Sequence, residues 1–179
     1  MIYNIKGNLL DTHCQFICHQ VNCRGKMGSG VAKSIREKWP VVFEKYQEKC
    51  NFALDLALND KQPNTDASTY LLSTIQCVAL YNDYEIDVKR QYVINMFAQN
   101  YYGYDRNLYT SYDAFWKCLR SIAEIVPKRS TIAFPKNIGC CRGGANWKVI
   151  STMIEEVLGK DYEVFIYELE ENKVCLQKT

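Results

Sequence analysis

The sequence predicts a three-layer α/β/α sandwich around a central mixed, mostly parallel sheet. Short apolar runs alternate along the chain with segments whose apolar residues have helical spacing, a pattern typical of α/β proteins. Two glycine-bearing loops, at 22–30 and 135–145, each follow a predicted strand and precede a predicted helix. Because ligands of such sheets collect at the carboxyl ends of strands, we expect the two loops to face each other across one crevice.

Length and composition predict a single soluble domain over residues 1–179. The hydrophobic content of 47% and the charged content of 23% are typical of globular proteins. A net charge of +2 argues against general binding to nucleic acid or to membranes, so an anion must be held by a local site. There is no apolar stretch of about 18 residues and no signal-peptide pattern. We therefore expect a cytoplasmic monomer with no membrane partner.

Nine cysteines are expected to be reduced in such a chain. The segment from His13 to Cys23 contains residue types that bind zinc. If residues 16–21 form a strand, however, Cys14 and Cys18 lie about 13 Å apart. Ligands of one zinc ion lie at about 2.0–2.3 Å from it. We therefore expect no metal and no other cofactor.

The first half of the chain is predicted to contain two strands followed by two helices. The apolar run at 16–21 is expected to be a buried, central strand. The spacing of Val31 and Ile35 is helical, and Pro40 suits the first turn of the next helix. The predicted elements are strands at 2–5 and 16–21, helices at 29–39 and 41–50, and a polar loop at 60–68.

The second half is predicted to contain further strands, an exposed aromatic loop and two helices. Thr110 to Asp113 matches a capping box at the start of a long helix, and Asn146 is a candidate cap for the last helix. The predicted elements are strands at 70–72, 75–80, 92–97, 131–134 and 163–169, an aromatic loop at 99–108, and helices at 110–126 and 147–158.

The first glycine loop has the order strand, loop, helix that suits a phosphate. Backbone N–H groups and the positive end of a helix converge there. Gly25, Gly28 and Gly30 can adopt positive φ or let a ligand approach the backbone. The loop is neither a Walker A loop nor a dinucleotide fingerprint, since the glycines have the wrong order and no Gly-Lys-[Ser/Thr] ends it. A plain tight turn is the alternative interpretation.

Five stretches, which cover nearly the whole chain in order, carry recognisable motifs: 6–9, 19–32, 94–99, 134–140 and 146–158. The first glycine loop lies within His-Gln-Val-Asn-Cys-Arg-Gly-Lys-Met-Gly-Ser-Gly-Val-Ala, and the second begins within Phe-Pro-Lys-Asn-Ile-Gly-Cys. Together these stretches resemble the macrodomain family. The resemblance is strongest to the branch that includes the terminal ADP-ribose glycohydrolase and the ADP-ribose 1″-phosphate phosphatases.

The resemblance implies a pocket for ADP-ribose. In the family an acidic residue after the first strand contacts the adenine; Asn8 stands there and offers an uncharged acceptor, so that bond should be weaker. The resemblance also implies an aromatic side chain beside a ribose, from Tyr101, Tyr102 or Tyr104. The implied ligand-binding residues are Asn8, Leu9, Asn22, Gly28, Ser29, Gly30, Val31, Ile138, Gly139, Cys140, Cys141, Arg142, Gly143 and Gly144.

The chain departs from the family at its catalytic positions. Relatives that remove ADP-ribose pair a lysine nucleophile with an aspartate of the second glycine loop. Gln99 stands near the lysine position, Lys89 lies several residues too early, and Asn146 replaces the aspartate. Gln99 cannot form a Schiff base. We therefore expect a water-based reaction with Asn22 and Asn146 as candidate catalytic residues, although Asn146 is equally interpreted as a helix cap.

The other candidate catalytic residues are weighed against purely structural roles. His19 is interpreted as a core or supporting residue rather than a general base, because it lies on a buried strand. Cys140 and Cys141 lack an identifiable base that would make either a nucleophile. Asp11, in the loop after the first strand, is a further candidate acid or base.

Three functions remain open from the sequence. The first is a hydrolase acting on ADP-ribose 1″-phosphate or on ADP-ribosylated protein or nucleic acid. The second is a non-catalytic ADP-ribose reader or sponge, including one that acts on NAD-derived signals in defence between phage and bacterium. The third is a nucleic-acid binder, which the near-neutral charge disfavours. Its candidate residues are Lys26, Lys33, Arg36, Arg106 and Arg142.

Overall fold

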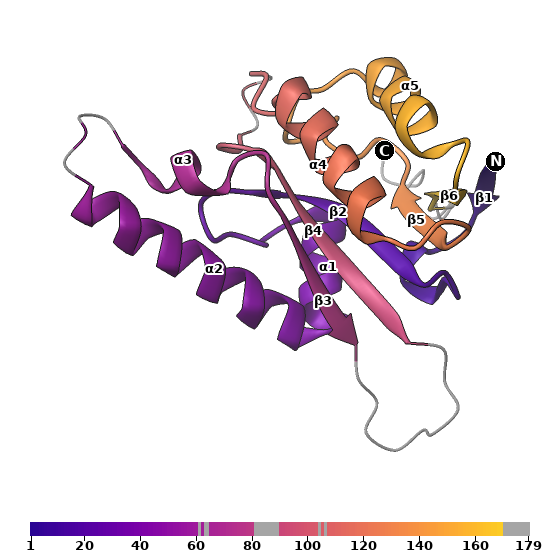
Figure 1. The fold of residues 1–179 in the computed structure, drawn as a ribbon, viewed down its shortest axis with the longest axis horizontal. Helices are drawn as coiled ribbons and strands as arrows, with labels where there is room; N and C mark the ends of the chain where they lie inside the picture. Colours follow the sequence, from indigo (N-terminus) through magenta and orange to yellow (C-terminus); the bar gives the residue numbers. More distant parts are fainter. Residues whose placement is uncertain (61, 63–64, 81–89, 104, 106, 170–179) are drawn as a thin grey trace, which may run out of the picture.

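A mixed sheet runs through the centre of the molecule (Figure 1). The computed structural model of the chain describes residues 1–60, 62, 65–80, 90–103, 105 and 107–169. Within these residues the strand order is β1-β6-β5-β2-β4-β3, and every neighbouring pair is parallel except β3 with β4. The strands are β1 (Ile2–Lys6), β2 (Phe16–Asn22), β3 (Ile75–Leu80), β4 (Gln91–Gln99), β5 (Thr131–Pro135) and β6 (Glu163–Glu168).

Helices cover both faces of this sheet, which confirms the predicted three-layer sandwich. Helices α4 and α5 lie on one face, and α1 and α2 lie on the other (Figure 1). The helices are η1 (Leu9–Asp11), α1 (Gly30–Lys38), α2 (Pro40–Asn59), α3 (Ala67–Leu71), α4 (Tyr112–Ile125) and α5 (Trp147–Leu158). The predicted mixed, mostly parallel sheet is confirmed as well.

Strand β2 lies in the interior of the sheet because its side chains are apolar on both faces. Ile17 packs in one core cluster with Ile35 of α1 and Val42 of α2. The next residue, Cys18, packs in another cluster with Phe115 of α4. Successive side chains of a strand point to opposite faces, so β2 contributes to both cores. Its neighbours are β5 and β4, as expected for a central strand.

Two predictions for residues 41–72 are wrong in extent or type. Helix α2 continues to Asn59 rather than ending at residue 50, because Ala53 and Ala57 extend its buried face. Residues 70–72 do not form a strand: α3 includes Tyr70 and Leu71. A run of three apolar residues is too short for its period to distinguish a strand from a helix.

The caps of the last two long helices were predicted with different success. Ser111, not Thr110, caps α4, and its Oγ accepts from the N–H of Ala114 at 3.1 Å. Thr110 instead forms an isolated β-bridge with Gln99. Asn146 caps α5 as predicted, since its Oδ1 accepts from the N–H of Lys148 at 2.9 Å.

No helix in the described part of the chain is long and apolar enough to cross a membrane. The cysteines that the structure describes are free thiols, and most of them are buried. Among the same residues there is no group of three or more histidines, cysteines or carboxylates that could hold a metal ion.

Candidate functional site

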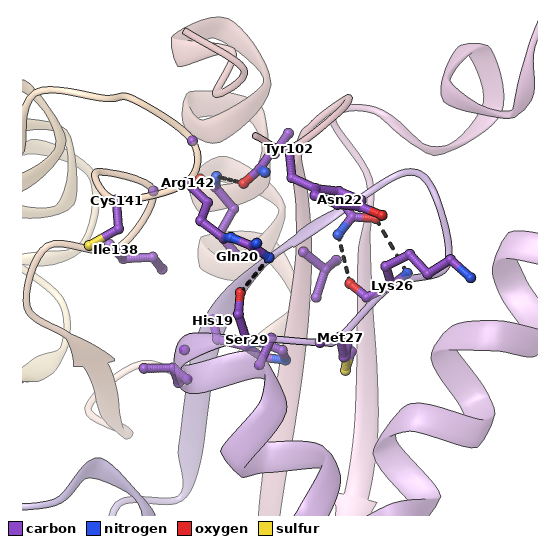
Figure 2. A pocket seen from close by; sticks show the side chains of 18 of the residues that line it. His19, Gln20, Asn22, Lys26, Met27, Ser29, Tyr102, Ile138, Cys141 and Arg142 are labelled. Atoms are coloured by element: carbon purple, nitrogen blue, oxygen red, sulfur yellow. Dashed lines mark hydrogen bonds between the residues drawn. The ribbon is translucent and has the colours of Figure 1, made fainter. Parts of the chain in front are cut away.

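The two glycine loops line one cavity, as the sequence predicted. Strands β2 and β5 are parallel neighbours, so the loops that follow them emerge at the same edge of the sheet. The cavity has a volume of about 510 Å³, within the range of roughly 300–1,000 Å³ typical of small-molecule sites. Figure 2 shows side chains from both loops directed toward it.

Asn22 fixes the shape of the first loop. Its Nδ2 donates to the backbone oxygen of Lys26 at 2.7 Å (Figure 2). Its Oδ1 accepts from the backbone N–H of Arg24 at 2.9 Å. The hydroxyl of Tyr46, on α2, lies 3.0 Å from the same Oδ1. Asn22 is therefore occupied in holding the loop, and only 8% of it is exposed.

The N-terminus of α1 opens into the cavity. Gly30 and Val31, at its first turn, belong to the lining. The N-cap residue Ser29 makes no side-chain cap, so its Oγ does not cover the first N–H groups of the helix. Gly30 has φ of +54° and a Cβ there would meet no atom within 4 Å. The first N–H groups of a helix have no intrahelical partner and lie at the positive end of its dipole, which suits an anion.

Gln20 positions the second loop from β2. Its Nε2 donates to Oε1 of Gln99 and to Oγ1 of Thr110, each at 2.8 Å. The hydroxyl of Thr110 in turn donates to the backbone oxygen of Gly139 at 3.0 Å. Gly139 has φ of +75°, and a Cβ at this position would lie 2.7 Å from Oε1 of Gln20. Side chain and loop thus fit together only because residue 139 is a glycine.

Arg142 connects the two loops. Its Nη1 donates to Oγ of Ser29 at 2.8 Å, across the cavity (Figure 2). Its guanidinium also lies 5.6 Å from the ring centroid of Tyr102, a cation–π distance. Tyr102 stacks on Tyr101 with centroids 5.3 Å apart and an interplanar angle of 7°. Among the three tyrosines considered for ribose contact, Tyr102 lines the cavity.

The charge of the lining is positive. Lys26, Arg36, Lys136 and Arg142 line the cavity, whereas no aspartate or glutamate does so among the residues that the structure describes. Lys136 forms an ion pair with Glu168 at 2.8 Å. In a chain whose net charge is +2, this arrangement places a positive potential at one point. The cavity is therefore suited to an anionic ligand.

Two buried acceptors in the lining have no hydrogen-bond partner within the described part of the chain. They are Nδ1 of His19 and Oε1 of Gln20. Nε2 of His19 lies 2.6 Å from Oδ1 of Asn95, whose Nδ2 donates to Oε1 of Gln76 at 3.0 Å. This arrangement places the imidazole proton on Nε2 and leaves Nδ1 as an acceptor. Burial lowers the pKa of His19 to about 4, so the ring is neutral near pH 7.

Most of the predicted ligand-binding residues lie together in the lining, and four do not. Asn8, Leu9, Cys140 and Gly144 are not part of it. Oδ1 of Asn8 accepts from the N–H of Leu10 and caps η1, which leaves the adenine contact a prediction. The predicted residues that line the cavity are Asn22, Gly28, Ser29, Gly30, Val31, Ile138, Gly139, Cys141, Arg142 and Gly143.

The predicted catalytic residues do not form a reactive pair. Asn146 lies outside the lining with its side chain held as a helix cap, and Asn22 holds the first loop. Gln99 lines the cavity, where its Nε2 donates to the backbone oxygen of Tyr101 at 2.6 Å. Asp11 is exposed and forms an ion pair with Lys38 at 3.2 Å, away from the lining.

Of the remaining candidate residues, Cys141 lines the cavity, and the others lie outside its lining or outside the residues that the structure describes. Burial raises the pKa of the Cys140 thiol to about 11, so it is protonated near pH 7, while Cys141 is exposed at the lining. Lys33 is exposed on α1 and lies 3.6 Å from Glu37. Lys89, Tyr104 and Arg106 lie outside the residues that the structure describes.

Sequence reasoning missed Gln20 and Lys136 as parts of the site. Gln20 is the penultimate polar position on an apolar strand that leads into the glycine loop, a signal that was available. Lys136 directly follows β5, where ligand-binding residues of parallel sheets are expected. The hydrogen bonds of Gln20 to Gln99 and Thr110, and the ion pair of Lys136 with Glu168, could be identified only from the fold.

Comparison with known proteins places the fold among the macrodomains. No family model matches the chain. The macrodomain of Thermus aquaticus DarG superposes with a TM-score of 0.66 at 22% identity, covering 94% of this chain and 98% of that one. The macrodomain of Mycobacterium tuberculosis DarG gives 0.67 at 20% identity, covering 93% and 97%. Thermosipho africanus DarTG in complex with ADP-ribose gives 0.70 at 19% identity, covering 99% and 43%.

A sequence relative with a named activity also matches. The ADP-ribose 1″-phosphate phosphatase of Aspergillus oryzae is 30% identical over 117 residues, which make up 57% of this chain and 58% of that protein. The match thus covers less than two thirds of the relative's length. The chain thus has the macrodomain fold, as the resemblance of its loops led us to expect.

Proposed function

We propose that the cavity between the two glycine loops binds ADP-ribose or a derivative of it. The observation that carries this proposal is the combination of two kinds of group in one cavity. The N-terminus of α1 and the lining cations suit a diphosphate. The orphan acceptors of His19 and Gln20 suit donors such as ribose hydroxyls. ADP-ribose carries both kinds of group, and a related fold is known in complex with it.

We further propose that the chain hydrolyses such a ligand, with ADP-ribose 1″-phosphate as the first candidate substrate. The named activity of the Aspergillus oryzae relative supports this choice. In the reaction, a water oxygen bonds to the terminal phosphorus and the bond from phosphorus to the ribose oxygen breaks. The ribose oxygen takes up the proton that the water loses and leaves as a hydroxyl. The positive lining would stabilise the charge on the phosphate oxygens, and a neutral acceptor such as Nδ1 of His19 would orient the water. Hydrolysis of ADP-ribose bonded to protein or nucleic acid is the second candidate reaction.

A non-catalytic reader is the alternative, and a specific observation favours it. The described lining holds no carboxylate that would serve as a strong base, and Gln99 provides no amine. Asn146, at the place of the family's aspartate, is a helix cap outside the cavity. Such a protein would bind ADP-ribose and leave it intact.

Calorimetry with ADP-ribose tests the binding proposal. Gly28 lines the cavity, has ordinary φ, and a Cβ there would meet no atom within 4 Å. Gly28→Glu therefore places a carboxylate beside the diphosphate with little strain and should abolish binding. Gly28→Gln is the matched control, of the same size without the charge, and should bind more weakly than wild type but measurably. Equal affinities for all three proteins would show that the first loop is not the diphosphate site.

Product analysis separates the enzyme from the reader. The wild-type protein is incubated with ADP-ribose 1″-phosphate and, in parallel, with an ADP-ribosylated protein. Release of phosphate or of free ADP-ribose, absent with Gly28→Glu, supports the corresponding hydrolase. Tight binding of both ligands without release of either product would leave the reader as the function.

A further inference from the structure

The contact between Arg142 and Ser29 joins residues 113 positions apart, from opposite sides of the cavity. Arg142 lies in the loop between β5 and α5, and Ser29 lies directly before α1. Figure 2 shows the arginine side chain extending from the second loop toward the serine. Both residues belong to the cavity lining, so their contact crosses the space that a ligand would enter.

Ser29 is directed to this contact rather than to its own helix. It stands at the N-cap position of α1, where serine commonly accepts from an N–H of the first turn. Here it makes no such bond, and its Oγ accepts from Nη1 of Arg142 at 2.8 Å. Ser29 thereby holds the guanidinium of Arg142 beside the N-terminus of α1.

The other side of the guanidinium is held by an aromatic stack. The guanidinium carbon of Arg142 lies 5.6 Å from the centroid of Tyr102, which stacks on Tyr101. The guanidinium carbon of Arg24 lies 5.6 Å from the ring centroid of Tyr101. Arg24 donates to Oδ2 of Asp66 at 2.9 Å and to Oδ1 of Asn100 at 2.8 Å. The tyrosine pair is thereby fixed on its own side by an anchored cation.

We propose that Arg142, held in place by Ser29 and Tyr102, is the residue that makes the cavity select for phosphate. The inference rests on the proposed function, because it concerns the same cavity and assigns its main anion contact to a side chain rather than to backbone amides. Ser29 and Tyr102 are positioning residues that act through Arg142. The ligand class is a phosphate-bearing nucleotide sugar, recognised through its phosphate oxygens.

The chemistry of arginine fits this role better than that of lysine. A guanidinium has five N–H donors in a planar fork, which matches the geometry of phosphate oxygens and also allows bonds to neighbours such as Ser29. Its plane also stacks on an aromatic ring. A lysine retains the charge but cannot satisfy serine, ring and phosphate with one fixed geometry. Because Ser29 and Tyr102 already fix the side chain, less conformational entropy is lost when the ligand binds.

Calorimetry with two probes, ADP-ribose and inorganic pyrophosphate, tests the inference. Arg142→Leu should weaken binding of both by about 10- to 100-fold, as expected for loss of a charged hydrogen bond. Arg142→Lys should fall between Arg142→Leu and wild type. Lys33→Leu is the control, since it removes one positive charge from α1 outside the lining and should leave both affinities unchanged.

A double-mutant cycle tests the positioning role of Ser29. Ser29→Ala should weaken binding about 3- to 10-fold in the wild-type background, because the ligand must then immobilise the released side chain of Arg142. It should have no further effect in the Arg142→Leu background, because nothing remains to be positioned. A loss of the same size in both backgrounds would show that Ser29 does not act through Arg142. Unfolding curves for each variant confirm that the protein is folded at the assay temperature.

The two probes keep this inference distinct from the proposed function. If pyrophosphate binds in an Arg142-dependent manner and ADP-ribose does not bind, the inference stands and the proposed function fails. If ADP-ribose binds with the same affinity to wild type and to Arg142→Leu, the proposed function stands and the inference is overturned. If the wild-type protein binds neither probe, both are overturned.

Discussion

The hydroxyl of Tyr46 lies 2.8 Å from the backbone oxygen of Asn22 and 3.0 Å from its Oδ1, although the two residues are 24 positions apart. The same hydroxyl accepts from the backbone N–H of Lys26 at 3.0 Å. Tyr46 is fully buried on α2, and burial raises the pKa of its hydroxyl, so it remains a donor at neutral pH. One buried side chain thus fixes the start and the middle of the first glycine loop.

Tyr46→Phe should therefore reduce both stability and affinity. It keeps the ring and removes the hydroxyl, and with it the hydrogen bonds to Asn22 and to the N–H of Lys26. We expect a loss of about 1–2 kcal/mol in the free energy of unfolding, measured by chemical denaturation. Affinity for ADP-ribose, measured by calorimetry, should also fall, because the loop is no longer held.

Tyr162→Phe provides the matched control for Tyr46→Phe. The hydroxyl of Tyr162 donates to the backbone oxygens of Ala123 and Val126, away from the cavity. This variant should lose a comparable amount of stability and keep its affinity. An equal loss of affinity in both variants would mean that general destabilisation, not loop position, accounts for the effect.

The buried histidine predicts a pH dependence of stability. Burial lowers the pKa of His19 from 6.5 to about 4, so between these values the unfolded chain binds the proton that the folded chain excludes. Stability is then fully present above the unfolded pKa and is lost as pH falls toward the folded pKa. From pH 7 to pH 5 we expect a loss of about 2 kcal/mol from this group.

Chemical denaturation of wild type and His19→Gln at the two pH values measures the contribution of His19 to this loss of stability. The variant has no imidazole, so its loss between pH 7 and pH 5 should be smaller by that amount. The control is His13→Gln, because His13 is exposed to solvent. This variant should retain the pH dependence of stability of the wild type. A dependence unchanged by His19→Gln would contradict a neutral, buried imidazole.

Gly139→Ala should disturb the second loop through Gln20. Residue 139 has φ of +75°, and the added Cβ would lie 2.7 Å from Oε1 of Gln20. We expect a loss of about 1–3 kcal/mol in stability together with weaker binding of ADP-ribose. Gly28→Ala, which has ordinary φ and no atom within 4 Å of its Cβ, should be nearly neutral in unfolding experiments. If both alanines behave alike, the Gln20 contact does not constrain the loop.

Asn146→Ala tests whether that residue is a helix cap or a catalytic group. Its bond to the N–H of Lys148 and its place outside the cavity predict a loss of about 0.5–2 kcal/mol in stability with unchanged ligand affinity and turnover. Asn146→Ser can also cap a helix and should restore most of the stability. A fall in turnover in both variants at full stability would instead assign Asn146 to the chemistry.

Local patterns explain what could be predicted from the sequence. The apolar run of β2, the glycines after it and the cap at Asn146 depend on neighbours in the chain, and each was found in its predicted place. The length of α2 and the helical state of Tyr70 and Leu71 depend on packing between α2 and α3, which a short apolar run does not reveal.

The same distinction between local motifs and long-range contacts holds for the candidate site. Ten residues of the glycine loops were predicted because family motifs are local stretches. The roles of their partners depend on contacts over long sequence distances: Gln20 with Thr110 across 90 positions, and Ser29 with Arg142 across 113. A catalytic role for Asn146 stays a prediction, whereas its alternative interpretation as the cap at the start of α5 is confirmed.

The neighbouring positions of β2 and β5 have a consequence for how the protein unfolds. Their loops come from opposite halves of the chain and meet at one cavity. A ligand that contacts both loops acts as a reversible cross-link between those halves and closes a loop of more than a hundred residues. Its binding free energy then opposes separation of the N-terminal and C-terminal segments, so saturating ligand should slow hydrogen exchange of amides in β2 and β5 together.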